Sequence, residues 1–147
     1  MKNKSLYYFF LIFLLSLFSV SCSEKNIIEG NIGYPSDYVP QVEVFLENVA
    51  TGSQIIQLVE ASYEGESAYC FRDVPDGKYI IFAIPTEAEI ETLVGGYTNA
   101  VPCGLTVDCD DHTYIQLDVK EGKYLSGINI YDWNTDAVVI KQKQHYI

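Results

Sequence analysis

The stretch Tyr69–Pro85, with the sequence YCFRDVPDGKYIIFAIP, contains the clearest structural pattern in the chain. Apolar residues recur at every second position on both sides of its centre, a spacing that places them on one face of a β-strand. The centre has the chemistry of a turn: Pro75 fixes its φ at about −65°, Asp76 can bond back to the backbone, and Gly77 tolerates a positive φ. The stretch therefore predicts a β-hairpin with one face turned inward.

The same alternation continues over most of the chain. Further strands are expected over residues 28–32, 42–47, 54–61, 112–119 and 124–131, with a short one over 137–140. In the third of these, Ile56 and Leu58 are the expected inward pair, and near Ser126 the alternation slips where Gly127 permits a bulge. Turn residues separate the strands at intervals of about 8–12 residues, which is typical of a sandwich. We therefore predict an all-β, seven-stranded, antiparallel Greek-key β-sandwich.

One segment breaks the period of two. Thr86 and Glu89 have the spacing of a capping box, in which each side chain bonds the backbone amide of the other. Acidic residues follow in the first turns, where they favour the positive end of a helix, and Gly95-Gly96 is a stop signal. The sequence thus predicts one short helix over residues 87–94.

The N-terminus has the pattern of an export signal. Lys2 and Lys4 precede an almost wholly apolar run over residues 6–20, which is shorter than the roughly twenty apolar residues of a membrane-spanning helix. The sequence SVSC over residues 19–22 closes the run and resembles the lipobox of bacterial lipoproteins. The resemblance implies cleavage before Cys22 and attachment of acyl chains to it, which would form a durable membrane anchor. The alternative is an ordinary signal peptide followed by an incidental cysteine.

These boundaries divide the chain into four parts. We expect a lipoprotein signal peptide over residues 1–21, a lipidated tether over 22–26, a single sandwich domain over 27–134 and a tail over 135–147. Ser23 is not the aspartate that retains lipoproteins at an inner membrane, so the expected location is the bacterial cell envelope, with the outer membrane or cell surface preferred.

The mature chain is strongly acidic. It would have 147 − 21 = 126 residues, and without Lys2 and Lys4 it carries 9 − 2 = 7 basic against 20 acidic side chains, a net charge of 7 − 20 = −13. Such a surface repels phosphate backbones, and we expect no nucleic-acid partner.

A family resemblance follows from four features: the spacings Ile28-x-Gly30-x-Ile32 and Val42-x-Val44, the dipeptide Thr51-Gly52 and above all the run Phe71–Tyr79. Together they resemble the carboxypeptidase regulatory-like domain. The resemblance implies a seven-stranded sandwich of the transthyretin (prealbumin) type over about residues 27–133. It brings no catalytic residues with it, because in relatives attached to peptidases the domain is an accessory to a separate catalytic domain.

Three cysteines remain if Cys22 is lipidated. Cys103 and Cys109 enclose a short loop, and an exported chain meets an oxidising compartment, so a bridge between them is our first expectation. A bridge from Cys70 to either loop cysteine is the alternative. Cys70 is out of phase with Tyr69 and Phe71, which places it on the other face of its strand and favours a free thiol.

The densest polar cluster is Asp108, Asp110, Asp111 and His112. Three carboxylates and an imidazole could hold Ca²⁺ or a transition metal, but the spacing fails the calcium-loop pattern, and turns before strands also favour aspartate. We predict no metal and no other cofactor. No nucleophile elbow, zinc-protease motif or phosphate-binding glycine loop occurs either, and we predict that the protein is not an enzyme.

The aromatic residues are the remaining candidates for a site. Tyrosine and tryptophan combine a large apolar ring with a polar group, which suits contacts to sugars and proteins. The candidates for a surface patch are Tyr97, Tyr114, Tyr131 and Trp133, although Trp133 also suits a place at the bottom of the core. The favoured hypothesis is a lipid-anchored, non-enzymatic envelope module with an accessory or binding role. The alternatives are a carbohydrate- or protein-binding adhesin that uses these aromatics, and a small metal-binding hydrolase.

Replacing Cys22 with alanine should abolish incorporation of labelled palmitate, because the acyl chains require the thiol and the new amino group of that residue. Metabolic labelling of the wild-type and Cys22→Ala proteins in a bacterial host measures this directly. Labelling of the Cys22→Ala variant would contradict the lipoprotein interpretation and favour an ordinary signal peptide.

Overall fold

The computed structural model describes residues 25–87 and 93–133. In chain order the elements are β1 (Asn26–Gly33), β2 (Val42–Asn48), β3 (Gln54–Val59), β4 (Glu66–Val74), β5 (Gly77–Pro85), β6 (Gly95–Gly96), α2 (Ala100–Cys103), β7 (Leu117–Val119) and β8 (Tyr124–Leu125). The expected signal peptide, Cys22, residues 88–92 of the expected helix over 87–94 and the terminal strand over 137–140 lie outside the described residues.

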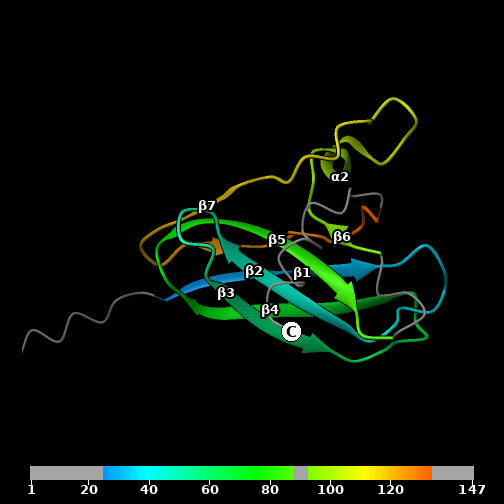
Figure 1. The fold of residues 1–147 in the computed structure, drawn as a ribbon, viewed down its shortest axis with the longest axis horizontal. Helices are drawn as coiled ribbons and strands as arrows, with labels where there is room; N and C mark the ends of the chain where they lie inside the picture. Colours follow the sequence, from blue (N-terminus) through cyan, green and yellow to red (C-terminus); the bar gives the residue numbers. More distant parts are fainter. Residues whose placement is uncertain (1–24, 88–92, 134–147) are drawn as a thin grey trace, which may run out of the picture.

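The strands form two sheets that face each other (Figure 1). One has three strands in the order β4-β1-β8, and the other has five, in the order β3-β2-β5-β6 with β7 also paired to β5. The all-β sandwich is therefore confirmed, but with eight described strands instead of seven. The extra strand is β6, made by the Gly95-Gly96 dipeptide that we expected to end a helix. The prediction of a purely antiparallel sandwich is wrong at one place, since β8 runs parallel to β1.

The predicted β-hairpin is wrong: β4 pairs with β1 in one sheet and β5 pairs with β2 in the other, so the turn between them connects the two sheets. The two strands still supply much of the core. Tyr69, Phe71, Tyr79, Ile81 and Ala83 are all buried between the sheets, as their alternation predicts. The turn differs in one detail from the expectation. The residue with positive φ is Asp73, at 59°, and not Gly77.

Gly77 is required instead for a close approach, because a Cβ at this position would lie 2.7 Å from the Asn48 side chain.

The inward pair predicted on β3 is wrong. Ile56 and Leu58 are each 52% exposed, while Val59 is buried. The register places Ile56 opposite Phe45, whose side chain points away from the other sheet. A period of two identifies residues that share a face, but it does not say which face is buried.

The turn between β4 and β5 is fixed by a buried amide at the start of β1. The Asn26 side chain is 4% exposed and donates to the Val74 carbonyl at 2.8 Å and to Asp76 Oδ1 at 2.9 Å. Its oxygen accepts from the Lys123 backbone amide at 2.8 Å. One side chain thus joins the first strand, the central turn and the loop before β8.

The chain from β8 to Trp133 closes one side of the sandwich. It pairs with β1 through Ile32 and Ile130 and then with β6 through Gly96 and Asp132, so it passes from one sheet to the other. On the opposite side β3 and β4 end their sheets without a strand partner among the described residues. A hydrogen bond from the Cys70 backbone amide to Gln57 Oε1, 3.2 Å long, bridges this seam.

The predicted bulge lies at Gly127, whose φ is 71°. Tyr124 pairs with Ile27, an offset of 124 − 27 = 97, whereas Ile130 pairs with Ile32, an offset of 130 − 32 = 98. One extra residue therefore lies between the two pairings, which is the definition of a bulge.

The hydroxyl of buried Tyr69 donates to the Ile128 carbonyl beside this bulge. Burial raises the pKa of Tyr69 above its ordinary value, so the hydroxyl remains a donor.

Replacing Gly30 with alanine should destabilise the fold strongly. The added Cβ would lie 2.0 Å from the backbone oxygen of Ile128, which cannot move without breaking the β1 pairing. We expect a loss of at least about 3 kcal/mol in the free energy of unfolding, measured by urea denaturation.

Gly65→Ala is the matched control. A Cβ at that position meets no atom within 4 Å, although its φ of 81° still carries a cost. A loss at Gly30 no larger than at Gly65 would show that the close approach is not rigid.

Candidate binding groove on the three-stranded sheet

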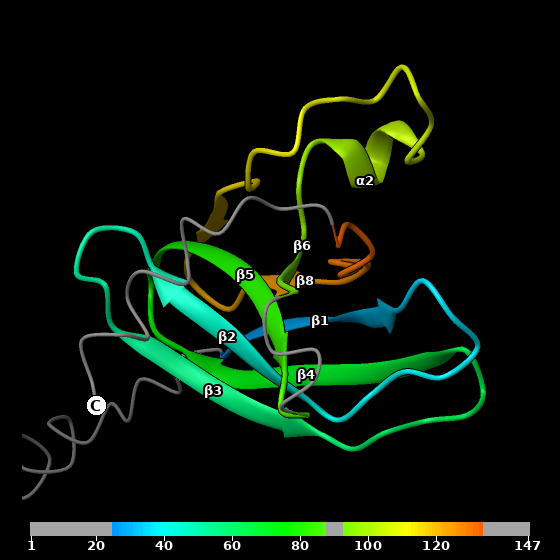
Figure 2. The ribbon, with the colours of Figure 1, turned by 45° about the vertical axis from the view of Figure 1, so that its right-hand side comes forward.

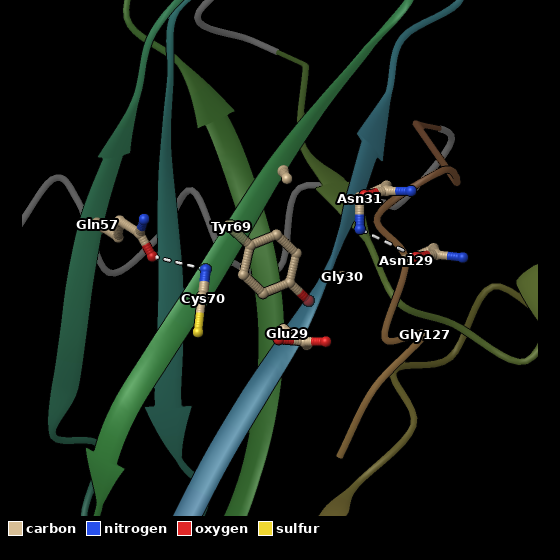
Figure 3. A pocket seen from close by; sticks show the side chains of 9 residues that line it. Glu29, Gly30, Asn31, Gln57, Tyr69, Cys70, Gly127 and Asn129 are labelled. Carbon is tan, nitrogen blue, oxygen red and sulfur yellow. Dashed lines mark hydrogen bonds between the residues drawn. The ribbon is translucent and has the colours of Figure 1, made fainter. Parts of the chain in front are cut away.

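A shallow pocket of about 550 Å³ lies over the three-stranded sheet (Figure 3). Its polar lining comes from four separate segments: Glu29 and Asn31 on β1, Gln57 on β3, Cys70 on β4 and Asn129 after the bulge. The rest of the lining is small or flat, including Gly30, Ala68 and Gly127. We call this pocket the groove.

The strand pattern explains why these side chains meet. Ile28 and Ile32 are fully buried, so Glu29 and Asn31 between them project from the outer face of β1. Cys70 lies out of phase with its buried neighbours on β4, as expected, and is a free, half-buried thiol. The bulge at Gly127 then positions Asn129 beside Asn31.

Hydrogen bonds hold the polar wall in place. The Asn31 backbone amide donates to Asn129 Oδ1 at 3.0 Å, and Asn31 Nδ2 donates to Glu66 Oε2 at 3.2 Å. Gln57 Oε1 accepts from the Cys70 backbone amide, so the side-chain oxygens of Gln57 and Asn129 each accept a hydrogen bond from a backbone amide. Within the described part of the chain, the NH₂ groups of these two residues donate to no protein acceptor. They are preformed donors for a ligand.

Two tyrosine–glutamate pairs flank the wall. The Tyr124 hydroxyl donates to Glu29 Oε1, and the Tyr131 hydroxyl donates to Glu66 Oε1 at 2.9 Å. The hydrogen bond to Glu29 raises the pKa of Tyr124, and burial followed by the bond to Glu66 raises that of Tyr131. Both phenols therefore stay protonated at neutral pH. The Tyr124 ring is 59% exposed beside the groove.

The four aromatic candidates do not form one exposed patch. Trp133 is only 9% exposed; it packs edge-on against Tyr34 and donates from Nε1 to the Gly33 carbonyl at 2.5 Å. Tyr97 packs against the main core, and Tyr114 lies 6.2 Å from Phe82 on the other sheet. Only Tyr131 borders the wall of the groove, through Glu66.

The groove residues themselves were not among the candidates predicted from the sequence. For Glu29 and Asn31 the sequence holds a signal, since both are polar residues between apolar ones on a predicted strand. Gln57 and Asn129 carry the same signal, but the sequence does not show that the packing of β3 and the bulge bring these two residues to the same place.

The Cys103–Cys109 disulfide is confirmed, with an S–S distance of 1.98 Å and a Cα–Cα distance of 5.8 Å. It closes the loop that follows α2, which projects from the β6 end of the sandwich (Figure 2). Asp108 and Asp110 are exposed in or just after this loop.

The Asp111 carboxylate bonds its own loop, accepting from the Thr113 amide at 3.0 Å and from Asn99 Nδ2 at 2.8 Å. The hydrogen bond from the Thr113 hydroxyl is the main reason that the pKa of Asp111 is lowered, followed by the bonds from the Thr113 amide and from Asn99. Residues 25–87 and 93–133 contain no group of three or more His, Cys, Asp or Glu side chains that could hold a metal ion.

His112 belongs to a separate polar cluster. Its Nδ1 lies 2.8 Å from Asp132 Oδ2, and the fully buried Thr98 hydroxyl donates to the same oxygen at 2.6 Å. A nucleophilic hydroxyl is activated by donating its proton toward an imidazole. The Thr98 hydroxyl donates to the carboxylate instead, so the geometry describes a structural cluster that ties β6 to the end of the described chain.

Comparison with protein-family models, with curated proteins and with solved structures gives no significant match. Among the described residues, no helix combines the length and apolar character needed to cross a membrane.

Raising the pH through the pKa of His112 should lower the free energy of unfolding. The hydrogen bond with Asp132 raises the pKa of His112 in the folded chain. The stabilisation is therefore fully present below the unfolded-state pKa of about 6.5 and is lost as the pH rises through the higher folded-state value. Urea denaturation of the wild type and His112→Gln over this range measures the effect. The same decrease in the variant would contradict this role for His112.

Proposed function

We propose that this protein is a lipid-anchored, non-enzymatic β-sandwich of the bacterial cell envelope, of the carboxypeptidase regulatory-like kind, and that it binds a saccharide in the groove. The observation that carries the binding role is the preformed polar wall over a floor of small residues. The anchor and the envelope location rest on the sequence SVSC at residues 19–22 and on the apolar run before it.

The chemistry of the wall favours a ligand rich in hydroxyl groups. Two amide NH₂ groups, from Gln57 and Asn129, can donate, while Glu29 offers a second carboxylate oxygen that can accept. Planar amides and carboxylates pair well with vicinal hydroxyls, each of which donates and accepts. The small floor residues let a flat ring approach the backbone, and the exposed Tyr124 ring beside the groove provides an apolar face for stacking.

The charge of the groove favours an uncharged ligand. Glu29 lines the groove, Glu66 supports its wall, and the mature chain as a whole would carry a net charge of 7 − 20 = −13. This field repels phosphates, sulfated sugars and uronic acids. The ligand class that fits is therefore a neutral saccharide.

The arrangement does not favour catalysis in the groove. A glycosidase needs two carboxyl groups that flank a bond, one of them protonated. Among the described residues, Glu29 is the one carboxylate that lines the groove, Glu66 stands behind its wall, and each accepts a hydrogen bond from a tyrosine hydroxyl. His112 is bonded to Asp132 outside the lining. A metal-dependent hydrolase is the weaker alternative, and calorimetric titration with Ca²⁺ and Zn²⁺ tests it.

Removing either free amide should weaken saccharide binding about tenfold, since each supplies one hydrogen bond to the ligand. A glycan array with the exported protein first identifies a neutral saccharide, and isothermal titration then compares the wild type with Gln57→Ala and Asn129→Ala. Gln54→Ala, on the same strand as Gln57 but outside the groove, is the matched control and should bind normally.

An array without a neutral saccharide among its ligands would refute the ligand class. Equal saccharide affinity of all three variants would show that the saccharide binds outside the groove.

A further inference from the structure

Strand β3 ends the five-stranded sheet among the described residues, and its sequence QIIQLV carries no charge. Each of the other described strands longer than two residues contains at least one charged side chain. Proteins commonly protect an edge strand from further pairing with a charged side chain, a proline or a bulge. Residues 54–59 contain neither a charge nor a proline, and their register with β2 is unbroken. The edge of β3 is therefore suited to pairing with a further strand.

The pairing of β3 with β2 shows which of its backbone groups point to the free edge. The Asn48 amide donates to the Ser53 carbonyl at 2.8 Å, one step beyond the pair of Glu47 and Gln54. Asn48 and Ser53 are therefore a hydrogen-bonded pair, and such pairs alternate along an antiparallel ladder. The odd-numbered residues of β3 consequently bond to β2. The amides and carbonyls of its even-numbered residues, with Ile56 at the centre, point to the free edge.

Apolar side chains lie on both faces of this edge. Ile56 and Leu58 on the outer face are each 52% exposed, and Ile55 on the inner face is 37% exposed. Ile56 also ends an apolar row, since it pairs with Phe45, whose ring stacks on Phe82 with centroids 5.0 Å apart. Both phenylalanines are buried, whereas the row reaches water at Ile56. A strand added to the edge would cover this exposed end.

We propose that β3 pairs with β3 of a second copy of the chain, antiparallel and about a two-fold axis at Ile56. Such an axis relates two antiparallel copies of one strand, so each protomer contributes the same surface. Ile56 then lies opposite the partner's Ile56, and Gln54 lies opposite the partner's Leu58. Each pair of even-numbered residues exchanges two backbone hydrogen bonds. The apolar rows of the two protomers join end to end at the axis.

The charges near the edge suit a second copy of this chain. Glu43 and Glu47 on β2 are beside the two residues of β3 that face each other across the axis. Glu43 and the partner's Glu47 are then three strand spacings apart, about 14 Å, which exceeds the Debye length of about 8 Å at physiological salt. Glu60, just after the strand, accepts from Gln41 Nε2 of its own protomer at 2.8 Å. A basic partner would find no carboxylate on β3 itself.

The pairing should give a reversible dimer. Six residues from each protomer are fewer than the roughly 20–30 of a standard interface. Each mature chain would also carry a net charge of 7 − 20 = −13, so two copies repel at long range. Salt screens this repulsion and leaves the uncharged strands paired, so the dimer should strengthen as salt is added. The proposal depends on the edge of β3 and not on a saccharide in the groove.

Cysteine cross-linking of the exported protein tests the pairing. In a Cys70→Ser background, Ile56→Cys places two thiols opposite each other at the axis, and peptide mapping after mild oxidation detects the 56–56 bridge. Gln116→Cys is the matched control, because Gln116 is exposed, uncharged and next to β7, which pairs with β5. We expect the 56–56 bridge to form at least about tenfold faster than the 116–116 bridge. Equal rates would overturn the proposal.

A second test adds a charge at the axis. Ile56→Lys places two ammonium groups opposite each other, so the dissociation constant of the dimer should rise about tenfold, whereas Gln116→Lys should leave it unchanged. Sedimentation equilibrium over a concentration series, in one detergent, measures the constants, and urea denaturation shows that both variants fold. A wild type that stays monomeric, or an unchanged constant for Ile56→Lys, would overturn the proposal. So would a dimer that weakens as salt is added, since that result indicates ion pairs.

Discussion

The side-chain amide of Asn26 is the interaction on which the arrangement of the strands depends. It is buried, so each of its polar atoms must find a partner within the protein. Those partners are the Val74 carbonyl, the Asp76 carboxylate and the Lys123 amide, from two loops far apart in the sequence. The turn between β4 and β5 and the entry to β8 are consequently coupled, because neither can move without leaving the amide unsatisfied.

Sequence periodicity predicts much of this fold, because alternation reports strands and turn residues report their ends. The strands β4 and β5, the turn between them, the inner faces of β1 and β2 and the bulge at Gly127 all follow from it. The pairing of β4 with β5 does not, because alternation does not say whether a turn joins neighbouring strands of one sheet or strands of two sheets. It fails for Ile56 and Leu58, since an edge strand with apolar residues on both faces gives no sign of which face is inside. It also fails for β6, because two glycines carry no side chains from which to infer a strand.

The candidate site is less accessible to such reasoning. The Cys103–Cys109 bridge could be predicted because its partners are six residues apart and any loop conformation keeps them near. The groove joins residues about 100 positions apart, such as Asn31 and Asn129, through one extra residue at a bulge. Aromatic residues attracted attention in the sequence, but Trp133 is part of the core, and Tyr124, whose exposed ring lies beside the groove, was not among the candidates.

The groove lies across the seam between β3 and β4, where the edges of the two sheets are not paired. Gln57 and Cys70 line the groove from the two sides of that seam, and the hydrogen bond between them bridges edges that have no strand pairing. Local opening of the sandwich is least costly where the backbone ladder is interrupted. A molecule that binds both Gln57 and Asn129 holds the two sheets together. Ligand binding in the groove and the free energy of opening the sandwich are therefore coupled, so that each increases the other.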